Sequence, residues 1–285
     1  MNRETLAALG RETLNILSEG RYQSSSGLAV DVSGSLSDCV SATRLFRPAD
    51  FPEEIAAVLI SHAERPIVEV TWETTLQAAR RLIGEEPATD QEPLCLNFAS
   101  ARHPGGGFLS GSQAQEESLA RSSGLYASIS RQGEMYEHNR ALRTCLYSDY
   151  MIYSPRVPVF RHDRGDLLDE PYVVSFITAP AVNAAAVRKN EPHNIPDILP
   201  TMRRRLARLL WAAQQMQHST LVLGAWGCGV FGNDPASVAE LFHQALGRDG
   251  SFANCFRRIV YAVHDRSSGQ AVYSAFHRVL ADDGD

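Results

Sequence analysis

The sequence has no cysteine pattern of the kind that binds zinc and no long apolar run near its beginning. Its five cysteines are odd in number and widely scattered, without a CxxC motif or a Cys/His spacing suited to a metal. We therefore expect reduced thiols and no metal site. Residues 1–20 mix acidic residues with short apolar steps, which predicts an amphipathic helix that Gly20 closes. This pattern is not that of a signal peptide or membrane span, so we expect a cytoplasmic protein without a membrane partner.

Positive charge is also in short supply. The 27 lysines and arginines are outnumbered by 33 aspartates and glutamates, which gives a formal net charge of -6. A chain with this balance has no overall attraction to nucleic acid or to anionic membranes, so we predict no specific nucleic-acid binding. An anionic ligand must instead be held by local structure.

Internal repeats, low-complexity tracts and a convincing interdomain linker are all missing from the 285 residues. With 44% hydrophobic and 21% charged residues, the composition is that of a folded globular protein. We predict a single domain of residues 1–285, in which residues 1–65 form an N-terminal extension packed on a core of residues 66–285. We also expect a monomer.

Segments typical of strands and helices alternate along the chain. Apolar or alternating runs predict strands at 27–32, 66–72, 94–100, 149–155, 172–179, 220–226 and 258–264. Helical periodicity predicts helices at 73–84, ended by Gly84, at 198–218, and at 235–247, where Asp234 caps and Pro235 begins the helix. A polar segment, 85–93, is expected to be a linker. The alternation indicates α/β layers around a mixed or parallel sheet.

Two glycine-rich loops each follow an apolar strand and precede a helix. The first contains Gly105, Gly106 and Gly107, and the second spans residues 224–233. Glycines let backbone N–H groups approach an anion closely, and a helix N-terminus adds partial positive charge, so such loops can hold a diphosphate. The first lacks the Lys-Ser/Thr ending of a P-loop, and the second departs from the dinucleotide fingerprint. Tight turns are the structural alternative for either loop.

Two adjacent carboxylates, Glu116 and Glu117, follow the first loop. Ser112 and Gln115 form a capping-box pattern, so we expect a helix that begins at Ser112, continues to Ile129, and carries both glutamates in its first turn. There they stabilise the helix dipole by about 0.3–1 kcal/mol each, and Glu117 has an arginine at i+4. Alternatively, they place a general acid beside a bound anion. Burial and like charge would raise their pKa values, whereas the helix N-terminus would lower them.

Three further features have structural explanations. Cys228 is expected to be a small packed residue rather than a nucleophile, because no histidine is near it in sequence. The charged segment 162–170 is expected to be a solvated loop rather than a metal site. The arginine-rich segment 202–211 is expected to present a solvated helix face, with contact to polymer phosphates or nucleic acid as the alternative.

Three glycines, a seven-residue spacer and Gln-Glu-Glu together resemble the signature of poly(ADP-ribose) glycohydrolases, a branch of the macrodomain family. The similarity extends to residues 11–22, 70–82, 96–109 and 223–233, and these blocks look like the compact bacterial type. The resemblance implies a macrodomain-like three-layer α/β/α sandwich with a mixed central sheet and an N-terminal helical extension. It also implies binding of ADP-ribose and hydrolysis of the ribose–ribose O-glycosidic bonds of poly(ADP-ribose), mainly from chain ends. ADP-ribosylated proteins would be the acceptors, and no metal or cofactor would be needed.

The resemblance implies roles for individual residues. Glu117 would be the catalytic acid/base, while Glu116 and Gln115 hold and orient the scissile ribose. The other implied substrate-binding residues are Gly105, Gly106, Gly107 and Phe108 of the catalytic loop, Asn97 before it, Gly227, Cys228, Gly229, Val230, Phe231 and Gly232 of the diphosphate loop, and Glu73 and Thr74 near adenine. Phe231 would lie against the ribose-phosphate region. Ser100 stands where many macrodomains carry a second asparagine.

Two alternatives stay open at this stage. One is a non-catalytic reader of ADP-ribose, against which the intact Gln-Glu-Glu motif argues, because a pure binder needs no acid there. The other is a hydrolase that removes single ADP-ribose groups from a protein or a nucleic acid. Its loops would look similar, because the same ADP-ribose unit is held.

Overall fold

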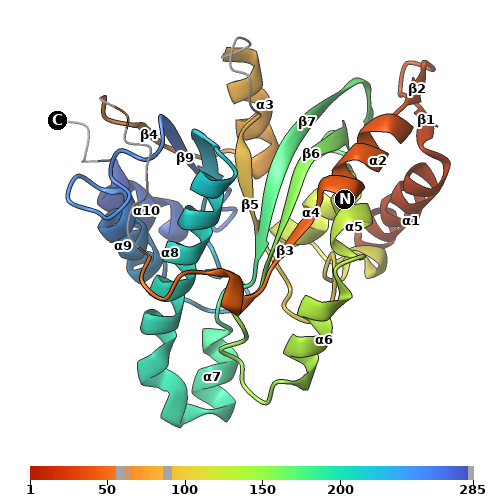
Figure 1. Cartoon of the computed structure of the whole chain (residues 1–285). Helices are drawn as coiled ribbons and strands as arrows, with labels where there is room; N and C mark the ends of the chain where they lie inside the picture. Colours follow the sequence, from red (N-terminus) through yellow and green to blue (C-terminus); the bar gives the residue numbers. More distant parts are fainter. Residues whose placement is uncertain (56–61, 63, 86–91, 282–285) are drawn as a thin grey trace. The chain divides into compact units, whose positions relative to one another are not determined.

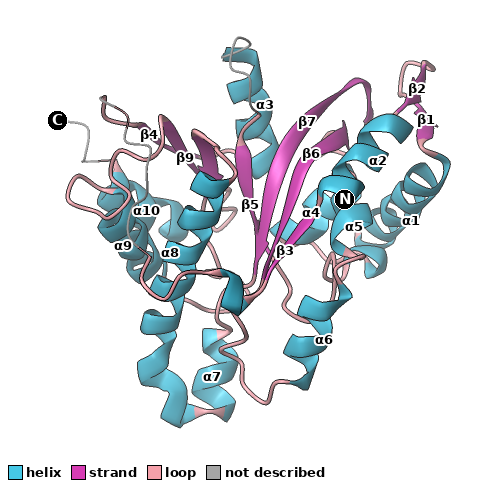
Figure 2. Ribbon diagram, viewed as in Figure 1, coloured by secondary structure: helices cyan, strands magenta, loops and turns pink. Residues whose placement is uncertain are grey.

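A computed structural model describes residues 1–55, 62, 64–85 and 92–281. The chain forms helices and strands in alternation (Figures 1 and 2). It divides into two compact units: unit 1 comprises Met1–Phe46, Asn97–Ala141 and Tyr150–Ala179, and unit 2 comprises the rest. One border between them falls within strand β5 (Leu94–Phe98). The prediction of one domain with an extension at 1–65 stays a prediction.

Unit 1 is built on antiparallel strands. Its elements are α1 (Arg3–Glu19), β1 (Arg21–Gln23), β2 (Ala29–Asp31), α2 (Ser33–Ala42), β3 (Arg44–Phe46), the 3-10 helix η2 (Phe108–Ser110), α4 (Gln115–Ser122), α5 (Leu125–Ile129), α6 (Gly133–Ala141), β6 (Met151–Arg161) and β7 (Leu167–Ala179). β6 pairs with β3 and with β7, while β1 and β2 form a separate hairpin. β6 is buried along nearly all of its length because α2, α4 and α5 pack against it.

The first helix confirms the prediction made from residues 1–20. The side chain of Asn2 caps α1 by accepting a hydrogen bond from Thr5 N at 2.8 Å, and Gly20 ends it in the left-handed conformation, at φ 70°. Ile16, on the buried face of α1, joins Tyr22, Val30 and Phe160 in one apolar cluster. This cluster fixes α1 and the following hairpin within unit 1.

Unit 2 is built on parallel strands. Its elements are the 3-10 helix η1 (Pro48–Asp50), β4 (Ile67–Thr71), α3 (Thr75–Glu85), α7 (Ala184–Asn190), the 3-10 helix η3 (Pro192–Asp197), α8 (Ile198–Gln215), β8 (Thr220–Leu223), α9 (Pro235–Leu246), β9 (Arg258–Ala262) and α10 (Ala271–Leu280). β8 pairs in parallel with β5 and β9, and β9 pairs in parallel with β4. The carboxyl ends of these strands therefore share one edge, the usual ligand-binding edge of a parallel sheet.

Several predicted boundaries hold and others are wrong. Asp234 caps α9 by accepting from Ser237 N at 2.8 Å, and Pro235 opens it, as predicted. Gly84 does not end α3, which continues through it to Glu85. Most of the predicted linker at 85–93, residues 86–91, lies outside the described residues. The predicted loop at 162–170 is a turn only as far as Asp166, after which β7 begins.

The predicted capping box at Ser112 is wrong. Helix α4 begins three residues later, with Ala114 as its cap and no side-chain capping bond. Ser112 is held in the preceding loop instead, because its N–H donates to Gly107 O at 3.2 Å and its carbonyl accepts from Arg121 Nη1 at 2.7 Å. The helix also stops at Ser122, and Ser123 forms a β-bridge with Val159. Long-range contacts thus outweigh the local helix signals.

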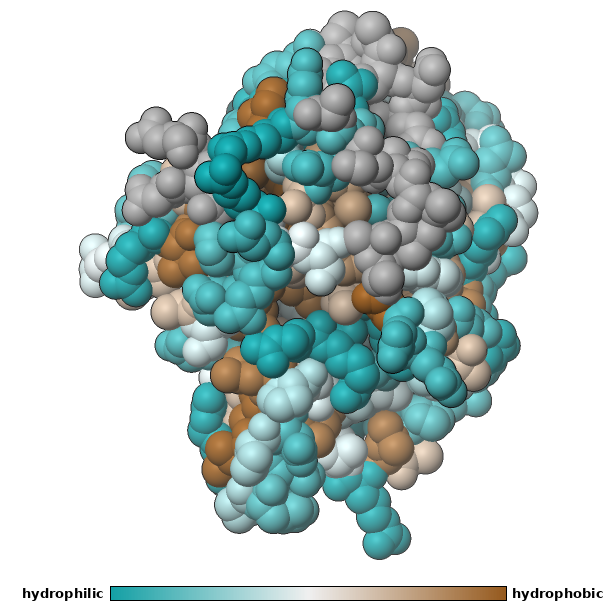
Figure 3. Space-filling model, turned by 60° about the vertical axis from the view of Figure 1, so that its left-hand side comes forward, coloured by the Kyte–Doolittle hydropathy of each residue, from teal (hydrophilic) through white to brown (hydrophobic). Residues whose placement is uncertain are grey.

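The exposed surface carries few large apolar side chains. On the face drawn in Figure 3, hydrophobic residues form small patches separated by hydrophilic ones. Among the helices that the structure describes, none combines the length and apolarity needed to cross a bilayer.

Candidate functional site

Glu116, in the first turn of α4, is buried and held by two donors, one within β5 and one just after it. Ser100 N donates to Glu116 Oε2 at 2.7 Å, and Asn97 Nδ2 approaches Glu116 Oε1 at 3.4 Å. The residue is only 2% exposed. These contacts fix one predicted site residue against another, and they show that Asn97 and Ser100 act on Glu116 within unit 1.

Burial dominates the electrostatics of Glu116. It raises the pKa of this carboxyl to about 8, against the hydrogen bond donated by Ser100 N and with a further rise from the charge of Glu117. For Glu116, burial therefore outweighs the hydrogen bonds that favour the ionised carboxyl. At neutral pH this carboxyl holds its proton, so the adjacent pair carries less than its full negative charge.

Glu117 is wrapped by the glycine loop. Its Oε1 accepts a hydrogen bond from Gly107 N at 3.0 Å, while its buried Oε2 has no hydrogen-bond partner among the described residues. Gly106 has φ 57°, and a Cβ added there would collide with Glu117 Oε1 and lie 3.3 Å from Glu116 Oε2. The loop therefore needs glycine so that its backbone can touch both carboxylates.

The other predicted residues of this loop contact the protein itself. Gln115 Oε1 accepts from Phe98 N at 2.8 Å, which ties the start of α4 to the end of β5. The ring of Phe108 is 1% exposed and lies 4.9 Å from that of Tyr126, between centroids. Phe108 thus anchors the loop in the interior of unit 1, and a direct substrate contact from its ring stays a prediction.

Helix α1 supports the segment that follows the first glycine loop, a role that the sequence did not reveal. Arg3 Nε donates to Ser110 O at 2.8 Å, and a Cβ at Gly10 would lie 2.9 Å from Phe108 O. Thr13 Oγ1 donates to Arg121 O, on α4, at 2.6 Å. Helices α1 and α4 therefore share a buried contact.

A buried arginine from β6 strengthens that contact. Arg161, 2% exposed, donates through Nε to the same Arg121 carbonyl at 3.1 Å. Its charge is balanced by Glu12 of α1, at 2.8 Å from Nη1. A buried guanidinium needs such a partner. The predicted neighbour of Glu117, Arg121, is itself occupied with Ser112 O.

Asn97 lies at the end of β5 with its side chain fully buried. Its Nδ2 also donates to Thr178 Oγ1, of β7, at 3.1 Å, while its Oδ1 has no partner among the described residues. Thr178 is a residue that sequence reasoning missed, because nothing local connects it to the Gln-Glu-Glu motif.

The second glycine loop, in unit 2, follows β8 and precedes α9. Gly227 and Gly232 have positive φ, 76° and 64°. Asn233 fastens the loop by donating through Nδ2 to Val182 O at 2.8 Å and to Gly227 O at 3.1 Å. Between them, a Cβ at Gly229 would meet nothing within 4 Å, and Val230 is 87% exposed. The ends of this loop are fixed while its middle is open.

Phe231 is supported by a segment that sequence reasoning did not connect with it. Its ring centroid lies 6.1 Å from that of Tyr147, and its carbonyl accepts from Ala185 N at 2.9 Å. Tyr147 holds the uncommon φ of 59°. Its carbonyl accepts from Arg205, which also donates to Pro180 O at 2.8 Å.

Arg205 corrects the prediction for the arginine-rich helix. The predicted solvated face includes Arg203 and Arg204, which are exposed, but Arg205 is fully buried. Its Nε lies 2.9 Å from Asp149 Oδ1, and Asp149 also pairs with Arg204 and Arg208. Asp149 is 56 residues away in sequence, so the pairing left no local signal.

Cys228 lies within the second loop and is unsuited to act as a nucleophile. Burial, with some help from the charge of Asp234, raises the pKa of its thiol to about 12. Its Sγ donates weakly to Trp226 O at 3.8 Å. A thiol held protonated in this way is inert, as expected from the sequence.

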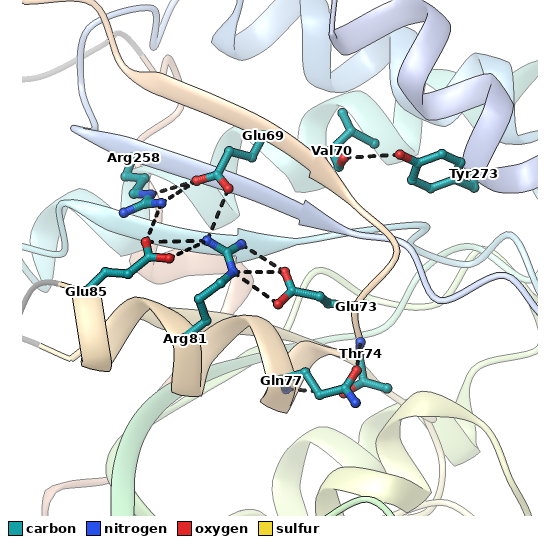
Figure 4. A network of polar contacts seen from close by, with 9 residues as sticks. All are labelled: Glu69, Val70, Glu73, Thr74, Gln77, Arg81, Glu85, Arg258 and Tyr273. Carbon is teal, nitrogen blue, oxygen red and sulfur yellow. Dashed lines mark hydrogen bonds and ion pairs between the residues drawn. The ribbon is translucent and has the colours of Figure 1, made fainter.

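Glu73 and Thr74 follow β4 and are both engaged in local structure. Figure 4 shows Arg81 of α3 among three carboxylates, with Glu69 at 3.1 Å, Glu73 at 2.8 Å and Glu85 at 3.3 Å. Arg258 of β9 pairs with Glu69 and Glu85 in turn, at 2.6 and 2.7 Å. The Glu73 carboxylate is therefore committed to holding α3 against the strands.

Thr74 caps α3 in the manner predicted for Ser112. Gln77 N donates to Thr74 Oγ1 at 3.2 Å, and Thr74 N donates back to Gln77 Oε1 at 3.0 Å (Figure 4). A capping box is thus formed at 74–77. Adenine contacts from Glu73 and Thr74 stay a prediction.

No group of His, Cys, Asp and Glu side chains within the described ranges is arranged to bind a metal ion. The buried carboxylates of α4 are held by backbone and amide donors instead.

Comparison with known proteins gives the chain its family. Residues 10–162, more than half of the chain, match the family model described as microbial-type PARG, catalytic domain. Among curated proteins, no match is found. The structure of poly(ADP-ribose) glycohydrolase (PARG) from Thermomonospora curvata is 47% identical, with a TM-score of 0.91, over 98% of this chain and 100% of that chain.

Two further structures contain ligands. The T. curvata glycohydrolase bound to the inhibitor ADP-HPD is 49% identical, with a TM-score of 0.89, over 97% of this chain and 99% of that one. The enzyme from Deinococcus radiodurans in complex with ADP-ribose is 44% identical, with a TM-score of 0.79, over 87% of this chain and 97% of that one. The predicted macrodomain-like α/β fold is thereby confirmed. The chain belongs to the family of microbial-type poly(ADP-ribose) glycohydrolase catalytic domains.

Proposed function

We propose that this protein hydrolyses the ribose–ribose O-glycosidic bonds of poly(ADP-ribose) and releases ADP-ribose, with Glu117 as general acid and base. Family membership and the likeness to bacterial glycohydrolases over nearly the whole chain support the activity. One observation carries the role of Glu117: its carboxylate is anchored at Oε1 by Gly107 N, while Oε2 is buried and has no partner among the described residues. An anchored carboxyl with one unused oxygen is suited to transfer a proton.

The chemistry follows from this arrangement. Glu117 gives its proton to the departing 2′-oxygen as the glycosidic bond breaks, and an oxocarbenium-like ribose is left. The ionised Glu117 then takes a proton from the attacking water. Glu116, held by Ser100 N, binds the ribose, and because burial keeps it protonated it adds little negative charge beside Glu117. No step in this scheme needs a metal.

The second glycine loop is proposed to bind the diphosphate through its backbone. Gly229 supports this role, because an added side chain there would meet no protein atom within 4 Å. The loop also precedes the N-terminus of α9, which favours negative charge. Phe231, with Tyr147 behind it, is proposed to contact the ribose-phosphate region. Since the Glu73 carboxylate is held by Arg81, any adenine contact there falls to its backbone or to Thr74.

The decisive experiment compares the wild type with Glu117→Gln on defined poly(ADP-ribose), with chromatography of the products. We expect the variant to lose turnover by about 10²- to 10⁴-fold, the usual contribution of a general acid/base, and to retain ADP-ribose binding by calorimetry. Glu137→Gln, an exposed carboxylate on α6, is the matched control and should keep full activity. Wild-type turnover in Glu117→Gln would refute the assignment. Binding without turnover in the wild type would make the protein a reader.

Release from chain ends and the use of ADP-ribosylated proteins as substrates belong to the same proposal. The length distribution of products from long polymer tests the first, since cleavage at ends gives ADP-ribose without oligomers. Comparing polymer with singly modified protein tests the second and separates a polymer hydrolase from one that removes single groups.

A further inference from the structure

Tyr136, on α6, has a buried hydroxyl with no hydrogen-bond partner among the described residues. Its side chain is only 1% exposed. Buried hydroxyl groups are costly when unpaired, so folded proteins pair nearly all of them, and an exception calls for a bound water or a ligand. Nothing in the sequence singles out this residue.

The position of Tyr136 connects it with the catalytic carboxylates. Burial raises the pKa of its phenol well above the usual value, and the charges of Glu116 and Tyr126 raise it further. The hydroxyl therefore lies within electrostatic reach of Glu116 and stays protonated. It is a neutral group that can donate one hydrogen bond and accept others.

The unpaired buried oxygens of unit 1 are concentrated around the same place. Within the described part of the chain they are Asn97 Oδ1, Glu117 Oε2 and Tyr136 Oη. Asn97 approaches Glu116 through its other amide atom, at 3.4 Å, and Glu116 and Glu117 both face Gly106. All three unpaired oxygens thus belong to the surroundings of one carboxyl.

Buried hydroxyls elsewhere in unit 1 are paired. Tyr22 Oη donates to Leu168 O at 2.7 Å, Ser123 Oγ donates to Leu119 O at 2.7 Å, and Ser128 Oγ shares a bond of 2.6 Å with Ser154 Oγ. Unit 1 thus satisfies these buried hydroxyls away from the two glutamates. The unpaired state of Tyr136 is local to the carboxylates.

We propose that Tyr136 is a positioning residue whose hydroxyl binds an O–H group, from a substrate ribose or from a water, beside the Glu116 carboxyl. Such a group accepts a hydrogen bond from Tyr136 Oη and donates one to an acceptor such as Asn97 Oδ1 or Glu117 Oε2. The unpaired atoms thus include both a hydrogen-bond donor, the Tyr136 hydroxyl, and hydrogen-bond acceptors, the oxygens of Asn97 and Glu117. The proposal rests on the proposed function, because it assigns Tyr136 to the same reaction.

The test is Tyr136→Phe, which removes the hydroxyl and keeps the ring. We expect kcat to fall by about tenfold, the effect of one lost hydrogen bond. The alkaline limb of its pH profile should move to higher pH, because the O–H group that Tyr136 holds beside Glu116, which can donate to the ionised carboxyl, is no longer held there. The other titratable groups that act on Glu116 or on Tyr136, namely Glu117 and Tyr126, are unchanged. Tyr22→Phe is the matched control, since it removes a paired buried hydroxyl.

Stability separates positioning from support of the fold. Tyr136→Phe breaks no hydrogen bond within the protein, so its melting temperature should equal or exceed that of the wild type. Tyr22→Phe leaves Leu168 O unpaired and should melt lower, with kcat and pH profile unchanged. A wild-type pH profile in Tyr136→Phe overturns the proposal, whatever its melting temperature.

Binding distinguishes the two sources of the O–H group. If it is a ribose hydroxyl, Tyr136→Phe raises both KM for the polymer and Kd for ADP-ribose by about tenfold. If it is a water, kcat and the pH profile change while Kd for ADP-ribose does not. Unchanged kcat, KM and pH profile together mean that the hydroxyl holds neither.

A measurement without substrate keeps this proposal separate from the proposed function. Should the wild type fail to cleave polymer, the function fails, and the pH dependence of the melting temperature becomes the test of Tyr136. Because the folded-state pKa of Glu116 is raised to about 8, stability declines as pH rises toward that value. In Tyr136→Phe, measured with and without ADP-ribose, this decline should continue to higher pH, and a curve that is unchanged in both conditions overturns the proposal.

Discussion

The two glycine loops share a sequence pattern but use their glycines differently. In the first, a Cβ at Gly106 would collide with Glu117, and one at Gly107 would lie 2.5 Å from Ser112 Oγ. In the second, a Cβ at Gly229 would meet nothing within 4 Å. The first loop therefore needs glycine to reach its own carboxylates. The second keeps an open backbone between fixed ends, as a loop that binds a ligand requires.

A carboxyl group near the first loop and one in unit 2 differ in the direction of their pKa shifts. Glu116, beside the first loop, has its pKa raised to about 8 by burial. Glu191 supports the segment before Tyr147 in unit 2, and its pKa is lowered to about 2. Burial opposes this lowering, but hydrogen bonds donated by Thr144, Cys145 and Asn194 favour the charged form. The Glu116 carboxyl is thus arranged to hold its proton, and the Glu191 carboxyl to stay ionised as a support.

The largest effect should come from Gly106→Ala. The left-handed conformation costs an L-residue about 1–2 kcal/mol, and the collision with Glu117 adds a displacement of the catalytic carboxylate. We expect a lower melting temperature and nearly complete loss of turnover. Gly34→Ala, at an open position in α2, is the control and should leave both unchanged. Full activity in Gly106→Ala would show that the first loop, like the second at Gly229, has room for an added side chain.

A smaller effect is expected on the pH dependence of stability, which should differ between variants of Glu116 and Glu191. Since the folded-state pKa of Glu116 is raised, the stability tied to its proton is present below about pH 4.5 and is lost as pH rises toward 8. Glu116→Gln should flatten this decline in melting temperature. Since the pKa of Glu191 is lowered, its contribution is present above about pH 4.5 and is lost as pH falls toward 2.

Glu191→Gln should therefore destabilise the protein at neutral pH and match the wild type near pH 2. The measurement is the melting temperature of each variant across the range, relative to the wild type. Parallel curves for the two variants would contradict the contrast between the carboxylates.

The sequence predicted what depends on local pattern. The buried strands, the helix ended by Gly20 and the capped start of α9 follow from apolar runs and capping residues close together in the chain. The Gln-Glu-Glu motif located the carboxylates, because family signatures are local. Sequence reasoning failed where residues distant in the chain decide the structure. Arg121 donates a hydrogen bond to Ser112 O, and α4 begins after Ser112 instead of being capped by it. Asp149 pairs with Arg205, which is buried rather than solvated.

The sequence indicated candidate site residues, whose roles stay predictions, but it did not indicate the contacts between them. That Asn97 and Ser100 would hold Glu116 requires knowing that the end of β5 meets the start of α4. The unpaired hydroxyl of Tyr136 left no trace in the sequence, since an aromatic residue on a buried helix face is ordinary core. Such a residue can be identified only in the folded structure, from the hydrogen bonds that its hydroxyl lacks, and not from the periodicity of the sequence.

The smallest structural effect should come from Gly229→Ala, and it is the most informative about the second loop. With no protein atom near the added methyl group, we expect stability to change by no more than about 0.5 kcal/mol. If the loop binds a diphosphate there, the methyl group takes the ligand's space and weakens ADP-ribose binding by about tenfold. Gly84→Ala, also at an open position but inside α3, should leave the affinity unchanged. Because the protein alone gives Gly229 no reason to be glycine, equal affinity in Gly229→Ala and wild type would remove the main support for a diphosphate at this position.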